Sequence, residues 1–250
     1  MLSAWKGRFT ILLVFLSVPF LLLITLPLGQ MLTSSGPQDL IRTIRDPQVL
    51  LALARSLGAA LSAAFICLMF GTPLAYLLAR RRFPGRRVVE GLVDLPIMIP
   101  HPVIGIAILS LVGQNHPLGR LMSDLGIQLM GTYSGIITVF TFVGLPFYVN
   151  AAKSGFEAIP VRLENVSRSL GASMISTFAR ITLPLAWRSM VLGMIMCTAR
   201  AISEFGAIVV VAYHPMTAPV LIYERFTAYG LDYSQPVAVW LVLISFCLFI

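Results

Sequence analysis

Charge is scarce in this sequence, and the scarcity excludes a soluble globular protein. Only 11% of the 250 residues are charged, 58% are hydrophobic, and the mean hydropathy is +0.89. A soluble domain carries about 25% charged residues. The composition therefore indicates an integral membrane protein, most of whose surface faces lipid.

Lysine, histidine and cysteine are also rare, which excludes several kinds of site. The two lysines, Lys6 and Lys153, lie outside any Gly-Lys-Ser/Thr loop of the kind that binds ATP phosphates. The three histidines are scattered, and the three cysteines lie in apolar runs without metal-ligand spacing. We therefore expect no catalytic residue, no metal site and no cofactor in this chain. If the protein uses ATP, a separate subunit must hydrolyse it.

Six apolar segments predict six transmembrane helices in a single domain of residues 1–250. The first could be mistaken for a secretory signal, but its apolar part is long and no clear cleavage site follows. The last has only 15 residues, fewer than the roughly 20 that a span needs. The segments are Phe9–Leu32, Leu50–Ala79, Leu92–Val112, Tyr133–Ala152, Trp187–Ala212, and Pro236 to the end.

The formal net charge of +8 is better explained by membrane topology than by nucleic acid. The N-terminus and the second and fourth connections together carry twelve Lys and Arg residues, whereas the first, third and fifth connections carry four, Arg42, Arg45, Arg120 and Arg225. Because basic residues favour the cytoplasmic side, both termini and those two rich connections are predicted to be cytoplasmic.

The longest polar interruption runs from Glu157 to Pro184 and predicts two short helices joined at Gly171. Pro160 suits the first turn of the first helix, Ser173 suits the N-cap of the second, and Pro184 is expected to end it. Glu164 and Arg168 stand four residues apart, in the order that favours an ion pair within the first helix. Each helix has an apolar stripe, formed by Leu163, Val166 and Leu170 in the first and by Met174, Phe178 and Ile181 in the second.

The spacing of Gly171, Ile181 and Leu183-Pro184 resembles the cytoplasmic EAA loop of ABC-transporter membrane subunits. Asn165, Val166 and Ser167 occupy the Glu-Ala-Ala positions, so the family's acidic residue is missing there. The resemblance implies that a coupling loop, about residues 153–186, fits a groove on an ATPase subunit. The alternative is an interfacial connector lying on the membrane. The residues expected to couple are Arg162, Glu164, Asn165, Val166, Ser167, Arg168, Gly171, Ala172 and Ser173.

Two later segments carry polar features at membrane depth. On a continuous fifth helix, Arg200 and Glu204 would lie four residues apart on one face, too deep to reach the inner surface easily. They could form a structural ion pair or line a translocation path. In the third segment, Pro96, Pro100 and Pro102 are expected to break the helix, either as a packed kink or beside a wet path.

A narrower resemblance rests on residues 71–109, 199–207, 213–216 and 218–225, which look like permeases for tetrahedral oxyanions. The archaeal molybdate/tungstate type is the closer match, and sulfate permeases are more distant. The resemblance implies an all-α type I ABC importer permease fold with six transmembrane helices, in a prokaryotic, archaeal-type plasma membrane. The expected path or gate residues are Arg200, Ser203, Glu204, Phe205, Gly206, Pro100 and His101.

The same resemblance implies partners. They are a second copy in a homodimer, two cytoplasmic ATP-binding subunits and an extracellular molybdate/tungstate-binding protein, with no nucleic acid. The expected binding-protein contacts are His214, Pro215, Met216, Tyr223 and Arg225. Two alternatives remain open, an importer of sulfate or another oxyanion and an ATPase-independent secondary transporter or channel. The second predicts inverted repeats, which the sequence does not show.

Overall fold

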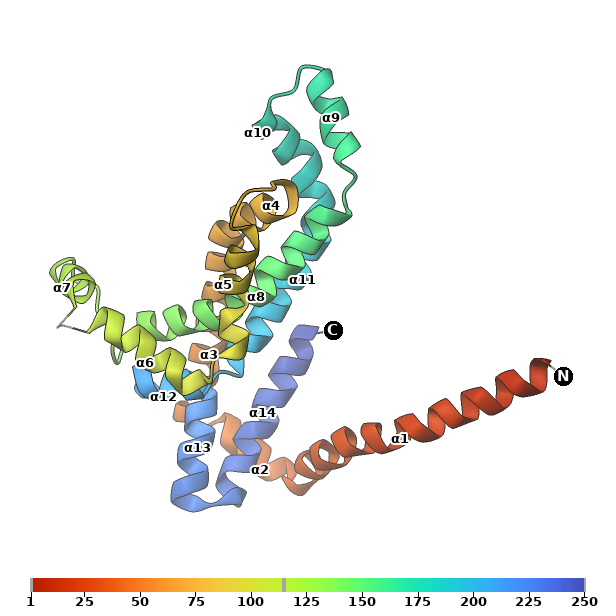
Figure 1. Cartoon of the computed structure of the whole chain (residues 1–250). Coiled ribbons are helices and arrows are strands. Elements are labelled where there is room, and N and C mark those ends of the chain that lie inside the picture. The colour runs from red at the N-terminus through yellow and green to blue at the C-terminus, as the bar shows by residue number, and fades with distance from the viewer. Residues whose placement is uncertain (1, 114–115, 250) are drawn as a thin grey trace.

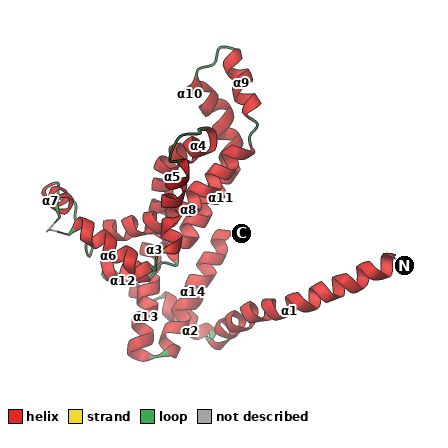
Figure 2. Ribbon diagram, in the orientation of Figure 1, coloured by secondary structure: helices red, strands yellow, loops and turns green. Residues whose placement is uncertain are grey.

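A computed structural model describes residues 2–113 and 116–249, which form helices and loops without any strand in those ranges (Figures 1 and 2). The all-α prediction is confirmed. In chain order the helices are α1 (Leu2–Ser34), α2 (Pro37–Ile44), α3 (Pro47–Ile66), η1 (Cys67–Gly71), α4 (Thr72–Arg80), α5 (Arg86–Met98), α6 (His101–Val112), α7 (Pro117–Asp124), α8 (Tyr133–Ala158), α9 (Val161–Ser169), α10 (Met174–Thr177), η2 (Phe178–Thr182), α11 (Leu183–Ile202), α12 (Gly206–Val211), α13 (Ala218–Tyr229) and α14 (Leu231–Phe249).

Within the described residues, five helical stretches are long and apolar enough to cross a membrane. A sixth span is present if the pair α5 and α6 counts as one. The five are Phe9–Ser34, Pro47–Arg80, Tyr133–Ala158, Met174–Ile202 and Leu231–Leu248. Because their length and composition match those of membrane-spanning helices, the chain is a multi-pass membrane protein.

The third predicted segment is broken in its middle. The chain bends by 115° between its two halves, α5 and α6. Ile99 between them is extended, the conformation favoured before a proline, and Pro100 starts the next helix as its N-cap. The proline cluster therefore breaks the helix as expected.

The fifth predicted segment is not one helix to Ala212, so that expectation was wrong. Helix α11 ends at Ile202, a loop follows, and α12 begins at Gly206. Glu204 thus lies beyond the end of α11, where its side chain reaches forward along the chain and accepts the N–H of Ala207. This side-chain bond caps the short helix α12 and compensates for the interrupted backbone ladder.

Pro184 does not end a helix, contrary to the prediction. It lies in the first turn of α11, and the stretch Met174–Ile202 continues through it. The π-helical turn η2 directly precedes it. A proline lacks the N–H of an interior helix position, and a wider π turn shifts the hydrogen-bond pattern at that point, so the chain can pass without a break.

Helices α8 and α11 form the centre of the packed body through small residues. A side chain on Gly144 would collide with the Cys197 sulfur at 2.5 Å, and one on Gly193 would lie 3.1 Å from Ala151. On Gly155 it would lie 2.7 Å from the Ser189 hydroxyl. Small residues let membrane helices approach closely, which supplies the van der Waals contact that holds them together.

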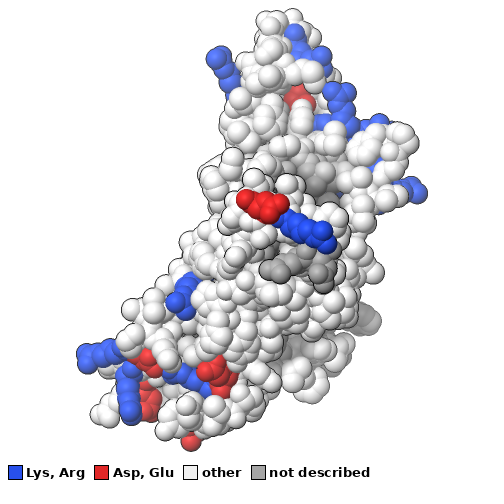
Figure 3. Space-filling model, turned by 90° about the vertical axis from the view of Figure 1, so that its left-hand side faces the viewer, with Lys and Arg blue, Asp and Glu red and all other residues white. Residues whose placement is uncertain are grey.

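In the face that Figure 3 shows, charged side chains gather toward the two ends of the molecule, and further acidic and basic side chains lie near its middle. One end holds α9 and α10, and the other holds α2 and the turn between α13 and α14 (Figure 1). Helix α1 leaves the body near this second end and projects away from it.

Candidate functional site

The break between α5 and α6 lies beside the loop between α11 and α12. Helix α6, which follows the first break, packs on α12, which follows the second. Glycines make this close packing possible: a side chain on Gly105 would lie 2.7 Å from Val210 Cβ, and one on Gly206 would lie 3.0 Å from His101 Cβ. Two irregular stretches of backbone are therefore brought to one place at membrane depth, where they must be packed in protein or face a wet cavity.

Three ionisable side chains meet at this junction. Arg200 Nη2 lies 2.7 Å from Glu204 Oε2 and 2.6 Å from His101 Nε2. The second oxygen of Glu204, Oε1, accepts the N–H of Ala207 at 3.0 Å. The ion pair between Arg200 and Glu204, foreseen from their spacing, is therefore present, although Glu204 is not on the helix that was expected to carry it.

The trio is asymmetric in its exposure. The Glu204 side chain is 0% exposed, whereas that of Arg200 is 19% and that of His101 is 45% exposed. The carboxylate thus lies behind the two nitrogen-bearing side chains. Such an arrangement neutralises Arg200 from the buried side and presents nitrogen donors on the accessible side, where they can attract an anion.

The other residues predicted for the path lie around this junction. Pro100 lies at the first break and is exposed, and Ser203 is exposed with its hydroxyl donating to the Arg200 carbonyl at 2.9 Å. Phe205 contacts α13 instead, with its ring centroid 4.9 Å from that of Tyr223. The structure therefore brings Pro100, His101, Arg200, Ser203 and Glu204 together, while Phe205 joins the junction to α13.

Sequence reasoning missed a polar contact series between α5 and α8. Asn150 Nδ2 donates to Asp94 Oδ1 at 2.6 Å, and one turn away Lys153 Nζ lies 2.5 Å from Glu90 Oε1. Glu157 Oε1 lies 3.4 Å from Arg86 and completes the series. These contacts join the first half of the broken span to the helix that leads into the coupling loop. An asparagine inside an apolar segment was the available signal, but its partner depends on the tertiary fold.

Glu164 is a buried anchor, and its expected ion pair with Arg168 is replaced by one with Arg80. The residue is 8% exposed. Its carboxylate lies 2.9 Å from Arg80 and also accepts from the Thr182 hydroxyl at 3.1 Å. Tyr76 contributes a longer hydrogen bond of 3.3 Å. These contacts tie α9 to α4 and to η2, so Glu164 fixes the position of the loop from inside.

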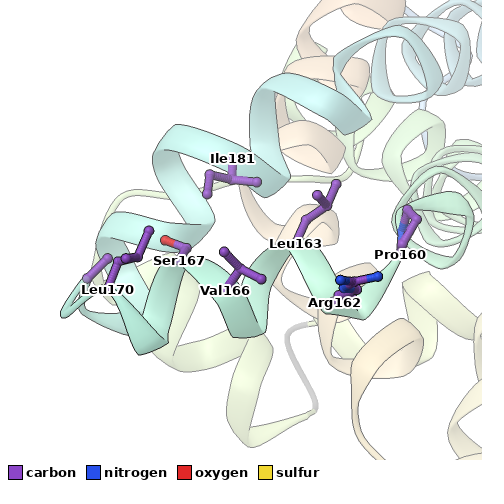
Figure 4. A pocket seen from close by; sticks show the side chains of 8 residues that line it. Pro160, Arg162, Leu163, Val166, Ser167, Leu170 and Ile181 are labelled. Carbon is purple, nitrogen blue, oxygen red and sulfur yellow. The ribbon is translucent and has the colours of Figure 1, made fainter.

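One surface of the coupling loop is an apolar hollow between α9 and η2, shown in Figure 4. Leu170 is 84% and Ile175 81% exposed near the turn between the two short helices. That turn has the predicted geometry, since Gly171 has φ +91° and Ser173 caps α10 by accepting the Ser176 N–H. The hollow is lined by Pro160, Arg162, Leu163, Val166, Ser167, Leu170, Ala172 and Ile181.

A second, more polar hollow lies at the turn of this loop. Unlike the first, it exposes mostly polar side chains and backbone. It is lined by Asn165, Arg168, Ser169, Gly171, Ala172, Ser173 and Met174. The residues predicted for ATPase coupling therefore divide between two adjoining surfaces, with Glu164 buried beneath them.

The residues predicted to contact a binding protein do not form one patch. His214 is exposed, but Met216 is half-buried and packs against two clusters of the core. Arg225 is paired with Asp46 and lines a separate open hollow between α2, α13 and α14, of about 930 Å³. Tyr223 stacks on Phe205. This end of the molecule therefore has a polar hollow, and Arg225 is the one predicted contact residue that lines it.

Residues 71–250 match the protein family described as "Binding-protein-dependent transport system inner membrane component". The molybdate/tungstate transport system permease protein WtpB of Thermococcus kodakarensis is 45% identical over 217 residues, which cover 87% of this chain and 83% of that protein. WtpB of Methanocaldococcus jannaschii is 43% identical over 242 residues, covering 97% and 94%.

The probable sulfate transport system permease protein cysT of Nephroselmis olivacea is 30% identical. The match covers 99% of this chain and 87% of that protein. Among solved structures, a chain of a bacterial alginate ABC transporter in complex with a pentasaccharide-bound periplasmic protein superposes with a TM-score of 0.72. It is 16% identical, and the match covers 98% of this chain and 93% of that one. At that identity the likeness concerns the fold, which is that of a type I ABC importer permease.

Proposed function

This chain belongs to the family of binding-protein-dependent transport system inner membrane components, and we propose that it is the permease subunit of an ATP-driven importer of molybdate and tungstate. The proposal rests first on identity of 43% and 45% to molybdate/tungstate permeases over most of the chain. The junction of two broken spans, with Arg200 and His101 on its accessible side, supports it. The chain is a permease subunit and not the ATPase.

Sulfate is the second candidate cargo. It too is a tetrahedral dianion, and nothing at the junction distinguishes the two by charge or shape. Molybdate and tungstate are preferred because the sulfate permease relative is only 30% identical, whereas the molybdate/tungstate relatives exceed 40%.

At the junction, the proposed path passes the accessible side of Arg200 and His101. A permeating anion must be attracted into the membrane but must also leave again, so weak binding is required. Glu204 supplies the necessary restraint, because its buried carboxylate offsets most of the attraction of Arg200. We place Pro100, Ser203, Phe205 and Gly206 in the same gate region.

The coupling loop is proposed to dock in a groove of the ATP-binding subunit. Leu170 and Ile175 are exposed apolar side chains on a short helical hairpin, which suits a helix-in-groove contact. The loop lies at the end of the molecule that follows α8, and the contacts of α8 with α5 connect it to the first break. Two such subunits, one for each permease copy, would serve the complex.

A homodimer is proposed because α1 has no buried face in the described structure. The apolar window of this helix is 0% buried, and the helix projects away from its own body (Figure 1). Its main contact is near its end, where Gln235 of α14 bonds the Met31 carbonyl at 3.3 Å. A second copy related by two-fold symmetry would receive α1 and supply the other wall of the path.

The opposite end of the molecule is assigned to the outside, where a molybdate/tungstate-binding protein would dock. The positive-inside rule supports this orientation, with both termini and the coupling loop cytoplasmic. The polar hollow around Arg225 and the exposed His214 are the proposed contact surfaces.

The deciding experiment is uptake into proteoliposomes that hold this chain, its ATP-binding subunit and the binding protein. ATP-dependent uptake of molybdate or tungstate, with little sulfate, is the expected result. Sulfate uptake would correct the cargo and keep the class. Uptake that continues without ATP or without the ATP-binding subunit would overturn the proposal, because it would show a secondary transporter or channel.

A further inference from the structure

The terminal nitrogen Nη2 of Arg200 is fully committed. It carries two N–H groups, one for each of its two acceptors, Glu204 Oε2 at 2.7 Å and His101 Nε2 at 2.6 Å. A guanidinium can only donate, so the Nε2 atom of His101 must accept, and the ring proton must be on Nδ1.

These two hydrogen bonds prevent Arg200 from binding an oxyanion through a pair of N–H groups. A guanidinium holds an oxyanion most strongly through two parallel N–H bonds from neighbouring nitrogens. It has two such forks, formed by Nε with Nη2 and by Nη1 with Nη2, and both need an N–H of Nη2. As long as Glu204 and His101 accept those two hydrogens, an oxyanion can form only single bonds to Arg200.

The two blocking acceptors differ in how easily they can leave. Glu204 is 0% exposed and also caps α12 through Ala207, so moving it would expose a buried charge and an uncapped helix. His101 is 45% exposed, and its Nδ1 lies 3.7 Å from Glu204 Oε2, beyond hydrogen-bond distance. It is the first residue of α6, directly after the break at Pro100. The imidazole is therefore the displaceable partner.

We propose that His101 occupies the place of the cargo on Arg200, and that a tetrahedral oxyanion displaces it. This inference rests on the proposed function, and it assigns His101 a positioning role in setting the affinity of the path. With the imidazole in place the path binds an anion weakly. When an oxyanion binds the freed pair of N–H groups, the contact between His101 in the first turn of α6 and Arg200 of α11 is lost. Cargo binding therefore changes the packing next to the break of the third segment.

The test compares three substitutions in the assembled permease–ATPase complex without its binding protein. His101→Leu removes the competing acceptor, and His101→Gln retains one in the side-chain carbonyl. His116→Asn is the control, because this exposed histidine lies outside the junction and outside the proposed contact surfaces, and asparagine keeps an acceptor for the Leu118 N–H. Equilibrium dialysis with radiolabelled molybdate measures affinity, and proteoliposome uptake with the binding protein measures the transport rate.

We expect His101→Leu to bind molybdate about tenfold more tightly than the wild type, the change that one charge-assisted hydrogen bond produces. Its transport rate should fall, because release becomes slower. His101→Gln should restore both values toward the wild type, and His116→Asn should leave both unchanged. Adding Arg200→Lys to His101→Leu should abolish the gain, because an ammonium has no fork.

Unchanged or weaker molybdate binding by His101→Leu, in a complex that still imports molybdate, would overturn this inference and leave the proposed function intact. A loss of folded complex in both His101→Leu and His101→Gln, seen by thermal unfolding, would also overturn it, because His101 would then be structural. A wild-type complex that neither binds nor imports an oxyanion would overturn the proposed function and this inference together.

Discussion

Glu204 is the residue whose surroundings most restrict substitution. Its carboxylate has no exposed surface, and its two oxygens are held by the Arg200 guanidinium and by the Ala207 N–H. A buried charge of this kind is tolerated because both a counter-charge and a backbone donor are present. Changes to its partners should therefore affect folding in a predictable order.

Arg200→Gln should destabilise the protein strongly, by about 3–5 kcal/mol, because it leaves the Glu204 carboxylate buried and uncompensated. Glu204→Gln should cost less, since a glutamine oxygen can still accept the Ala207 N–H. The double variant should be more stable than Arg200→Gln alone. Thermal unfolding in detergent would rank the three, and a double variant no more stable than Arg200→Gln would contradict the ion-pair account.

A second residue-scale prediction concerns Asp46, the N-cap of α3. Burial pushes the pKa of this carboxyl up, but the Gln48 N–H at 2.9 Å and the Arg225 guanidinium outweigh burial and hold the pKa below its ordinary 3.8. A lowered folded pKa means that the stabilisation is present above 3.8 and is lost as the pH falls through the folded value.

The contribution of Asp46 to the melting temperature should therefore be lost on acidification below about pH 4, as the pH falls through the lowered pKa. Asp46→Asn keeps a good N-cap but cannot titrate, so its drop should be smaller than that of the wild type. Equal slopes for the two proteins would show that the ion pair with Arg225 contributes nothing.

Among the helices, the tightest contact at the junction is that of α6 with α12. Gly105→Ala would place a methyl group 2.7 Å from Val210 Cβ and 2.9 Å from the Ala207 carbonyl, so the helices must separate. We expect a loss of about 1–3 kcal/mol and impaired transport. Gly91→Ala on α5 is the control, because a side chain there meets no atom within 4 Å.

The control should be neutral or stabilising by about 0.5–1 kcal/mol, since alanine favours a helix over glycine. Thermal unfolding and uptake would be measured for both variants. If Gly105→Ala were as stable and active as Gly91→Ala, the close approach of α6 and α12 would be wrong.

The coupling loop supports a further prediction about docking. Leu170→Asp should weaken binding of the ATP-binding subunit tenfold or more, because burial of a leucine contributes about 1.5–3 kcal/mol. Leu125→Asp, at an exposed leucine after α7, should not weaken it. Co-purification of the ATP-binding subunit with each variant tests this, and equal recovery would argue against the loop as the docking surface.

The helices themselves were largely predictable, because apolar stretches near membrane length specify them. The partnership of Arg200 and Glu204 was also predictable from spacing. The end of α11 at Ile202 was not, since residues 201–207 contain no proline, and the break depends on α12 packing against α6. Likewise the Arg80 partner of Glu164 lies far away in sequence, so a local pattern pointed to Arg168 instead.

At the scale of the whole molecule, removing α1 tests the proposed homodimer. A chain lacking residues 2–31 should keep its packed body, whose centre is α8 and α11, but should lose much of its dimer. Native mass spectrometry of detergent-solubilised protein would measure the ratio of dimer to monomer. Replacing α1 by an unrelated apolar helix of equal length controls for membrane insertion, and full dimer formation by this replacement would contradict a specific role.

The exposed leucine and isoleucine of the coupling loop also have a consequence for the cell. In the proposed orientation, a permease copy without its ATP-binding subunit would present Leu170 and Ile175 to the cytoplasm, and exposed apolar clusters of this kind promote aggregation. Quality-control proteases and chaperones act on such surfaces. If the loop docks as proposed, production of the two subunits would need to be balanced, because surplus permease would be exposed to degradation.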